Sequence, residues 1–162
     1  MDLVSSVIPI ASRLNTTDTI RVLNRITWCV DAQVLAAVKK IGLQRYTEQQ
    51  LQPSTVTLPA PVQAQIAAMT ITQVPFEPLV QELEQRRKAA ASIVDDQAKS
   101  QARKAYQQEL TRLAREAATR SLLRDVYAPN QLQEQMTWFW MNHFSIYQGK
   151  RDLRAMVGDY EE

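Results

Sequence analysis

The stretch from Leu79 to Tyr127 contains neither glycine nor proline, the residues that most often interrupt a helix. Its apolar residues recur at steps of mostly three or four, which is the period of a helix. The stretch therefore predicts either one very long helix or two helices with a break between residues 92 and 100. Because alanine supplies most apolar positions in its first half, we expect that half to protrude and the residues after Leu110 to pack more firmly.

Glycine is scarce throughout the chain, with only three among 162 residues, whereas alanine, glutamine, leucine and arginine are abundant. Strand-rich folds use glycine at many turns and phosphate-binding loops require it, so both are disfavoured. The abundant residues are good helix formers. We therefore predict an all-α fold, an irregular helical domain with one long, partly protruding helix or helical hairpin.

Prolines and glycines divide the chain into five parts of a single helical domain, residues 1–162. Within the first part, Asp31 is placed to cap the start of a helix that Gly42 ends. The predicted parts are short helices at 17–52, proline-rich connectors with a short helix at 53–78, a long basic helical region at 79–127, a buried aromatic helix at 129–147, and a short helix with a tail at 148–162.

The segment MTWFWMNHFSIYQGK, residues 136–150, holds two of the three tryptophans, two of the three phenylalanines and the only histidine. Trp138, Met141 and Phe144 lie on several faces of the helix, which is therefore apolar nearly all round and typical of an element buried by several neighbours. At about 100° per residue, one arc of roughly 120° collects the side chains that we predict as structural core. They are Leu132, Met136, Phe139, Trp140, His143, Ile146 and Tyr147.

His143 allows two interpretations. It is either a core histidine hydrogen-bonded to a carbonyl or carboxylate, or a ligand or proton-transfer group. His143 and Lys150 are the candidates for a catalytic role, and no other catalytic residue is predicted. One histidine and one cysteine, Cys29, do not supply a zinc ligand set, so no metal site and no cofactor are predicted, and cofactor-binding residues stay unassigned.

Charge is distributed unevenly along the chain. Residues 84–124 carry ten basic and five acidic side chains, whereas residues 125–162 carry three basic and six acidic ones. In the basic stretch the cations alternate with alanine and glutamine, and only Tyr106 accompanies them for base stacking. We therefore interpret it as a solvated helix face, and nucleic acid is not the partner we predict.

No stretch reaches the roughly 18 apolar residues of a membrane span, so none is predicted. Residues 1–11 are apolar but lack the basic start of a signal peptide. We therefore expect a cytoplasmic protein, or an exported one whose signal peptide was removed ahead of this numbering.

Three stretches carry a family resemblance. Residues 128–162 contain QLxExMxxFWxNHF followed by DYE, residues 115–132 read REAATRSLLRDVYAPNQL, and residues 22–54 open with VLNRITWC and close with QLQPS. Together they resemble the bacterial domain-of-unknown-function 1800 family. Trp28 and Cys29 stand where the family has Phe-Gly. The resemblance implies a bacterial protein with a helical N-terminal region, and it implies no reaction.

Two hypotheses for function follow. The first is a non-catalytic helical packing or protein-interaction domain, whose partner is a second copy or a C-terminal segment missing from this chain. The second is the N-terminal half of an enzyme or cofactor site, with His143 and Lys150 completed by residues beyond Glu162. Members of the family are usually several hundred residues long, so we expect this chain to be a fragment of a longer protein.

Overall fold

The computed structural model describes residues 16–52, 57–146, 156 and 159, and the regular structure in these ranges is entirely helical, as predicted. Apart from residues 156 and 159, the predicted C-terminal helix and tail at 148–162 lies outside the described residues. In chain order the helices are α1 (Thr16–Ile26), α2 (Ala32–Ile41), α3 (Leu43–Gln50), α4 (Ala60–Ala67), α5 (Thr70–Gln73), α6 (Phe76–Ser92), α7 (Asp96–Tyr127) and α8 (Gln131–His143).

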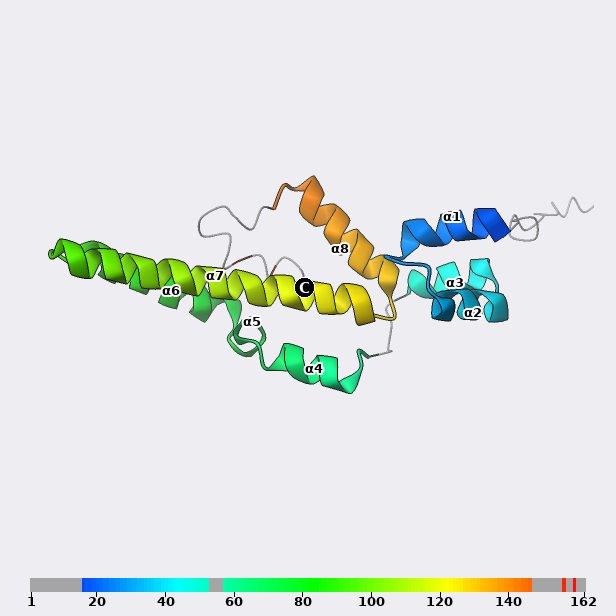
Figure 1. Cartoon of the computed structure of the whole chain (residues 1–162), viewed down its shortest axis with the longest axis horizontal. Helices are drawn as coiled ribbons and strands as arrows, with labels where there is room; N and C mark the ends of the chain where they lie inside the picture. The colour runs from blue at the N-terminus through cyan, green and yellow to red at the C-terminus, as the bar shows by residue number, and fades with distance from the viewer. Residues whose placement is uncertain (1–15, 53–56, 147–155, 157–158, 160–162) are drawn as a thin grey trace, which may run out of the picture.

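Helices α6 and α7 form the hairpin that was one of the two alternatives for the glycine-free stretch (Figure 1). The chain leaves the helical conformation at Ile93, and the Asp95 side chain accepts a hydrogen bond from the backbone N–H of Ala98 at 2.6 Å to start α7. This N-cap satisfies one of the free N–H groups at the helix start. With 32 residues, α7 is about 48 Å long and runs well beyond α6.

Leucines hold the two arms of the hairpin together. Leu79 and Leu83 of α6 pack on Leu110 and Leu113 of α7, and all four are buried. Ile71, Val74 and Tyr106 pack against this cluster from its edge. Leu110 and Leu113 are buried, as expected for this part of the stretch, but the first half does not simply protrude, because its Leu79 and Leu83 are buried as well. Helix α7 also contacts α4 and α5.

The region predicted as proline-rich connectors is more helical than expected. Residues 53–56 lie outside the described part, and α4, with Pro61 in its first turn, lies where a short helix was predicted. Pro78 falls within the region predicted as connectors, yet α6 already begins at Phe76 and includes Pro78 in its first turn. Proline is tolerated there because the first N–H groups of a helix have no intrahelical acceptor.

Helices α1, α2 and α3 build a second, separate core around Leu23, Val38 and Tyr46. Both predicted helix ends are confirmed. The Asp31 side chain accepts from the Val34 N–H at 2.7 Å, and Gly42 ends α2 with φ of 84°. This positive φ favours glycine because a Cβ would crowd the backbone.

Three side-chain amides join the two cores at the turn before α8, and we call Gln50, Asn130 and Gln131 the amide junction. Gln50 donates to the carbonyl of Pro129 at 3.1 Å and accepts from the Leu132 N–H at 3.2 Å. The Oε1 atom of Gln131 accepts from the Trp28 N–H at 3.3 Å. Its Nε2 donates to the carbonyls of Asp125 and Ala128 at 3.0 and 2.8 Å, respectively. Helix α8 rises from this junction between the hairpin and α1–α3 (Figure 1).

We predict that the hairpin core is sensitive to truncation. Leu113 is 0% exposed, so Leu113→Ala leaves a cavity and should lower the free energy of unfolding by about 2–5 kcal/mol. Leu122 lies further along α7 but is 61% exposed, so Leu122→Ala should cost no more than about 0.5 kcal/mol. Denaturant melts of both variants check this, and equal losses would contradict the packing described.

We also predict that the amide junction contributes measurably to stability. Gln131→Ala removes three hydrogen bonds and leaves two carbonyls and one N–H without their protein partner. It should therefore lower the free energy of unfolding by about 1–3 kcal/mol. Gln108→Ala, on an exposed position of α7, is the matched control and should be nearly neutral. Thermal melts of the two variants compare them directly, and a neutral Gln131→Ala would refute the assignment.

Candidate functional site

Helix α8 faces the rest of the protein with its polar side. At about 100° per residue, Gln131, Glu134 and Trp138 share one narrow face of α8. The ring of Trp138 meets that of Trp28, in the α1–α2 loop, edge to face with centroids 5.7 Å apart. Gln131 bonds the same loop and the end of α7. This face therefore fixes the rotation of α8 about its own axis.

The opposite face of α8 carries a group of exposed apolar and aromatic side chains. Trp140 is 47% and Phe144 66% exposed, and no residue of α8 is buried. We call this group the aromatic surface, and its members are Met136, Phe139, Trp140, His143 and Phe144.

The prediction of a buried aromatic helix at 129–147 was therefore wrong for the chain as described. Of the predicted core residues, Met136, Phe139, Trp140 and His143 are exposed, and Leu132 and Ile146 are half-buried. Tyr147 lies outside the described residues. The apolar arc requires a neighbour to bury it, and no described element covers that side of α8. Trp138, which the helical projection put outside the arc, contacts Trp28 of the α1–α2 loop, although its side chain is itself 56% exposed.

Helix α8 also ends earlier than predicted. Its last residue is His143, and Ser145 adopts a left-handed conformation with φ of 53°. The Ile146 N–H donates to the carbonyl of Met141 at 2.9 Å, which satisfies one of the last carbonyls of the helix. The predicted end of this helix, at residue 147, lies outside the described residues.

The rings of the aromatic surface contact one another. The His143 ring lies 5.9 Å from Phe139 in a stacked arrangement and 5.5 Å from Trp140 edge to face. Phe144 adds edge-to-face contact with His143 at 5.1 Å and stacks on Trp140 at 5.6 Å. Aromatic pairs with these separations attract one another beyond their buried area. His143 is therefore part of an exposed ring cluster and is not the core histidine of the first interpretation.

A half-buried pair of carboxylates lies at the base of α8. Burial raises the pKa of Asp125, in the last turn of α7, while a hydrogen bond from the Trp28 side chain opposes this shift. Burial also raises the pKa of Glu134, in the first turn of α8, and the charge of Asp125 adds to that effect while Arg124 opposes it. Sequence reasoning missed this pair because its members are nine positions apart on two different helices.

Lys150, the second predicted catalytic candidate, lies outside the described residues. Within the described ranges, no group of three or more His, Cys, Asp and Glu side chains is arranged to hold a metal ion. The same ranges contain no helix that is both long and apolar enough to cross a membrane.

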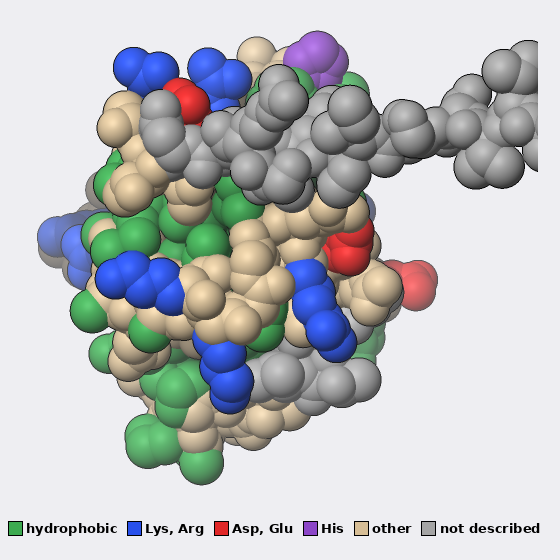
Figure 2. All heavy atoms as spheres, turned by 90° about the vertical axis from the view of Figure 1, so that its right-hand side faces the viewer, with side chains coloured by type: hydrophobic (Ala, Val, Ile, Leu, Met, Phe, Trp, Pro, Cys, Tyr) green, Lys and Arg blue, Asp and Glu red, His purple; other side chains and the backbone are tan. Residues whose placement is uncertain are grey.

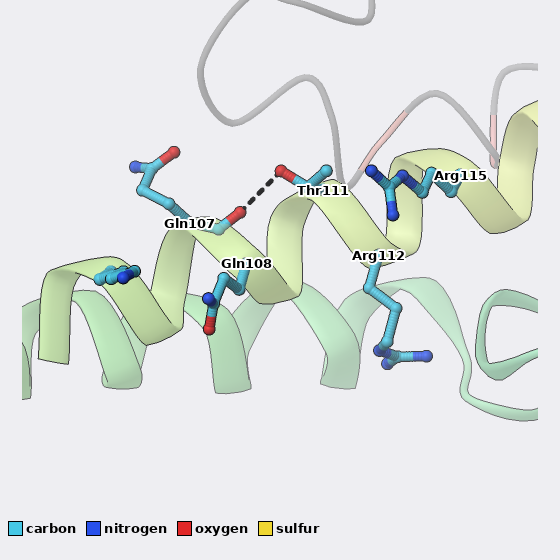
Figure 3. A pocket seen from close by; sticks show the side chains of 6 residues that line it. Gln107, Gln108, Thr111, Arg112 and Arg115 are labelled. Carbon is cyan, nitrogen blue, oxygen red and sulfur yellow. Dashed lines mark hydrogen bonds between the residues drawn. The ribbon is translucent and has the colours of Figure 1, made fainter. Parts of the chain in front are cut away.

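A shallow pocket of about 380 Å³ on the basic helix α7 is the other candidate (Figure 3). Its labelled side chains leave the helix in different directions, and Arg112 points away from the side of Arg115 (Figure 3). Arg112 binds Glu109 and Glu116, both at 2.6 Å, so its charge is already balanced within the helix. The hydrogen bond from Arg112 lowers the pKa of Glu109. The pocket is lined by Lys104, Gln107, Gln108, Thr111, Arg112 and Arg115.

Apolar side chains also reach the surface at the end of the molecule built by α1 to α3, where Lys and Arg side chains stand among them (Figure 2). The aromatic surface of α8 differs from that mixed surface because four of its five side chains are rings that contact one another. It is therefore the strongest candidate functional site in the described part of the chain.

Comparison with known proteins gives one match. Residues 21–162 match the model of a family described as protein of unknown function (DUF1800). No curated protein and no solved structure matches the chain.

We predict that Trp140 contributes little to the stability of the isolated chain. Because its side chain is about half exposed, Trp140→Ala should cost less than about 1 kcal/mol, in contrast to the 3–5 kcal/mol typical of a buried tryptophan. Urea melts followed by circular dichroism measure the difference. A loss above about 3 kcal/mol would mean that Trp140 is buried in solution, by this chain or by a second copy.

Proposed function

This chain belongs to the DUF1800 family of proteins of unknown function, and we propose that it is a non-catalytic helical domain that binds another protein segment through the aromatic surface of α8. One observation carries the proposal. Five apolar or aromatic side chains are exposed together on a helix whose other side is anchored by hydrogen bonds. Exposed clusters of this kind mark interaction sites in soluble proteins.

The energetics favour a covered aromatic surface. Burying one large apolar side chain contributes roughly 1.5–3 kcal/mol, and tryptophan is among the residues that dominate binding energy at interfaces. Two phenylalanines, one tryptophan, one methionine and the histidine ring are available here. Their mutual contacts limit the entropy that each side chain loses when a partner covers it.

The charge around α8 favours a protein partner over nucleic acid. Helix α8 contains no lysine or arginine, and the nearest carboxylates at its base are Asp125 and Glu134. Phosphate backbones bind where cations gather, so this surface lacks their main attraction. In the isolated chain, the apolar surface available to cover α8 is the same surface on a second copy.

We therefore predict concentration-dependent self-association and binding of a dye that detects apolar surface. The double variant Trp140→Ser and Phe144→Ser should lose most of both signals while its melting temperature changes little, because neither side chain is buried. Light scattering and dye fluorescence measure the two effects.

The matched control is Val94→Ser, at the hairpin tip, where the side chain is 95% exposed and distant from α8 in sequence. This variant should behave like the wild type in both measurements. A wild type that stays strictly monomeric at high concentration and binds no dye would refute the proposal.

A further inference from the structure

One face of α7 carries exposed cations and points away from the hairpin core. Lys104, Thr111 and Arg115 follow one another at steps of seven and four residues, so they fall within an arc of about 40° on the helix. We call these three residues the basic face. Leu113, which the hairpin core buries, lies roughly opposite. Figure 3 shows Thr111 and Arg115 on the side of α7 away from α6, and all three residues line the shallow pocket of about 380 Å³.

The two cations of the basic face have no acidic partner among the residues that the structure describes. Lys104 and Arg115 are both exposed. The ion pairs of α7 in the same part of the chain instead join Arg112 to Glu109 and Glu116. The aliphatic stems of Lys104 and Arg115 also offer apolar contact area, as long cationic side chains commonly do. The basic face is therefore suited to a segment that carries both apolar and acidic side chains.

The C-terminal segment of this chain has that composition. Its apolar residues recur at the spacing of one helix face, i, i+3, i+4 and i+7, and residues 155–162 carry three acidic and no basic side chains. The apolar residues are Leu153, Met156, Val157 and Tyr160, and the acidic ones are Asp159, Glu161 and Glu162. The structure describes two of these positions. Both are helical, and Met156 is half-buried whereas Asp159 is exposed. That difference is expected of an amphipathic helix with its apolar side against the protein.

The C-terminal segment is also long enough to reach the basic face. Helix α8 begins four residues after the end of α7 and runs back in the direction of the hairpin (Figure 1). With 13 residues it is about 20 Å long, so its far end stays within roughly that distance of α7. Residues 147–152 can span at most about 20 Å, which brings residues 153–162 within reach of Arg115.

We propose that the C-terminal segment, residues 153–162, docks on the basic face of α7. Its apolar side covers the aliphatic stems of the face, and the carboxylates of Glu161 and Glu162 pair with the two cations. The positive charge of this face is then balanced within the chain, which removes its attraction for a phosphate backbone. The docking uses a different surface from the aromatic surface of α8, so it stands or falls independently of the proposed function.

Hydrogen exchange followed by mass spectrometry measures the protection of residues 153–162 in the whole chain, at a dilution that suppresses self-association. Lys104→Glu with Arg115→Glu reverses both cations of the basic face. Glu161→Lys with Glu162→Lys reverses the acidic end of the segment. The variant with all four substitutions restores opposite charges on the two sides.

The matched control is Arg25→Glu with Arg45→Glu, at exposed positions of α1 and α3. It changes the net charge by the same amount as the reversal of the basic face and leaves α7 untouched. Circular dichroism of every variant checks that the helices are retained.

We expect either charge reversal to make the amides of residues 153–162 exchange roughly three- to thirtyfold faster, which is the factor that two exposed ion pairs are worth. The fourfold variant should recover most of the protection, and the control should keep it. Equal exchange in the wild type and both reversed variants would overturn the docking, as would a loss that the fourfold variant does not rescue.

A second measurement decides the matter if a charge reversal lowers the helical signal. In the wild type, raising the salt concentration from about 0.1 to about 1 M shortens the reach of exposed charges from about 10 to about 3 Å. Exchange of residues 153–162 should then become faster, while that of the hairpin core stays the same. Exchange of the segment that does not respond to salt would refute the docking.

Discussion

The hydrogen bonds of the amide junction are the constraint on which the arrangement of the two cores depends. Among the residues that the structure describes, the hairpin core and the core of α1–α3 form two separate buried clusters. Gln50 reaches from α3 to both sides of the turn before α8, and Gln131 reaches from α8 to Trp28 and to the end of α7. Gln50 and Gln131 each satisfy a donor and an acceptor at once, which apolar residues in the same places are unable to do.

This junction also explains why the aromatic side of α8 faces outward. A helix that is apolar nearly all round has no strong preference for the side it buries. The preference is set here by Gln131 and Trp138, which contact the α1–α2 loop. Once that face is anchored, Trp140 and Phe144 point to the other side, where the described chain offers no cover. A surface suited to binding thus results from polar contacts on the far side of the same helix.

Helix boundaries could be predicted from the sequence wherever they depend only on residues within one short segment. Asp31 and Gly42 bound α2 because a cap needs only its own residue and the first or last turn. Apolar spacing allowed either one long helix or a hairpin, and the break at Ile93 with the Asp95 cap of α7 shows that the chain forms the hairpin. Pro78 was assigned to a connector although it lies in the first turn of α6. Proline occurs both in connectors and in the first turn of helices, so the residue by itself does not distinguish the two.

The helical class and the concentration of aromatic residues in one helix could be read from the sequence alone, because these features depend on neighbours within a few positions. The orientation of that helix was decided only by tertiary structure. Whether Trp138 and Trp140 are buried or exposed depends on which elements pack against them. The contact that orients the helix is also distant in sequence, since Gln131 accepts a hydrogen bond from Trp28, 103 positions away. The same holds for Asp125 and Glu134, whose charges act on each other across the turn between α7 and α8. They belong to different helices, so the spacing of residues within one helix does not predict that they interact.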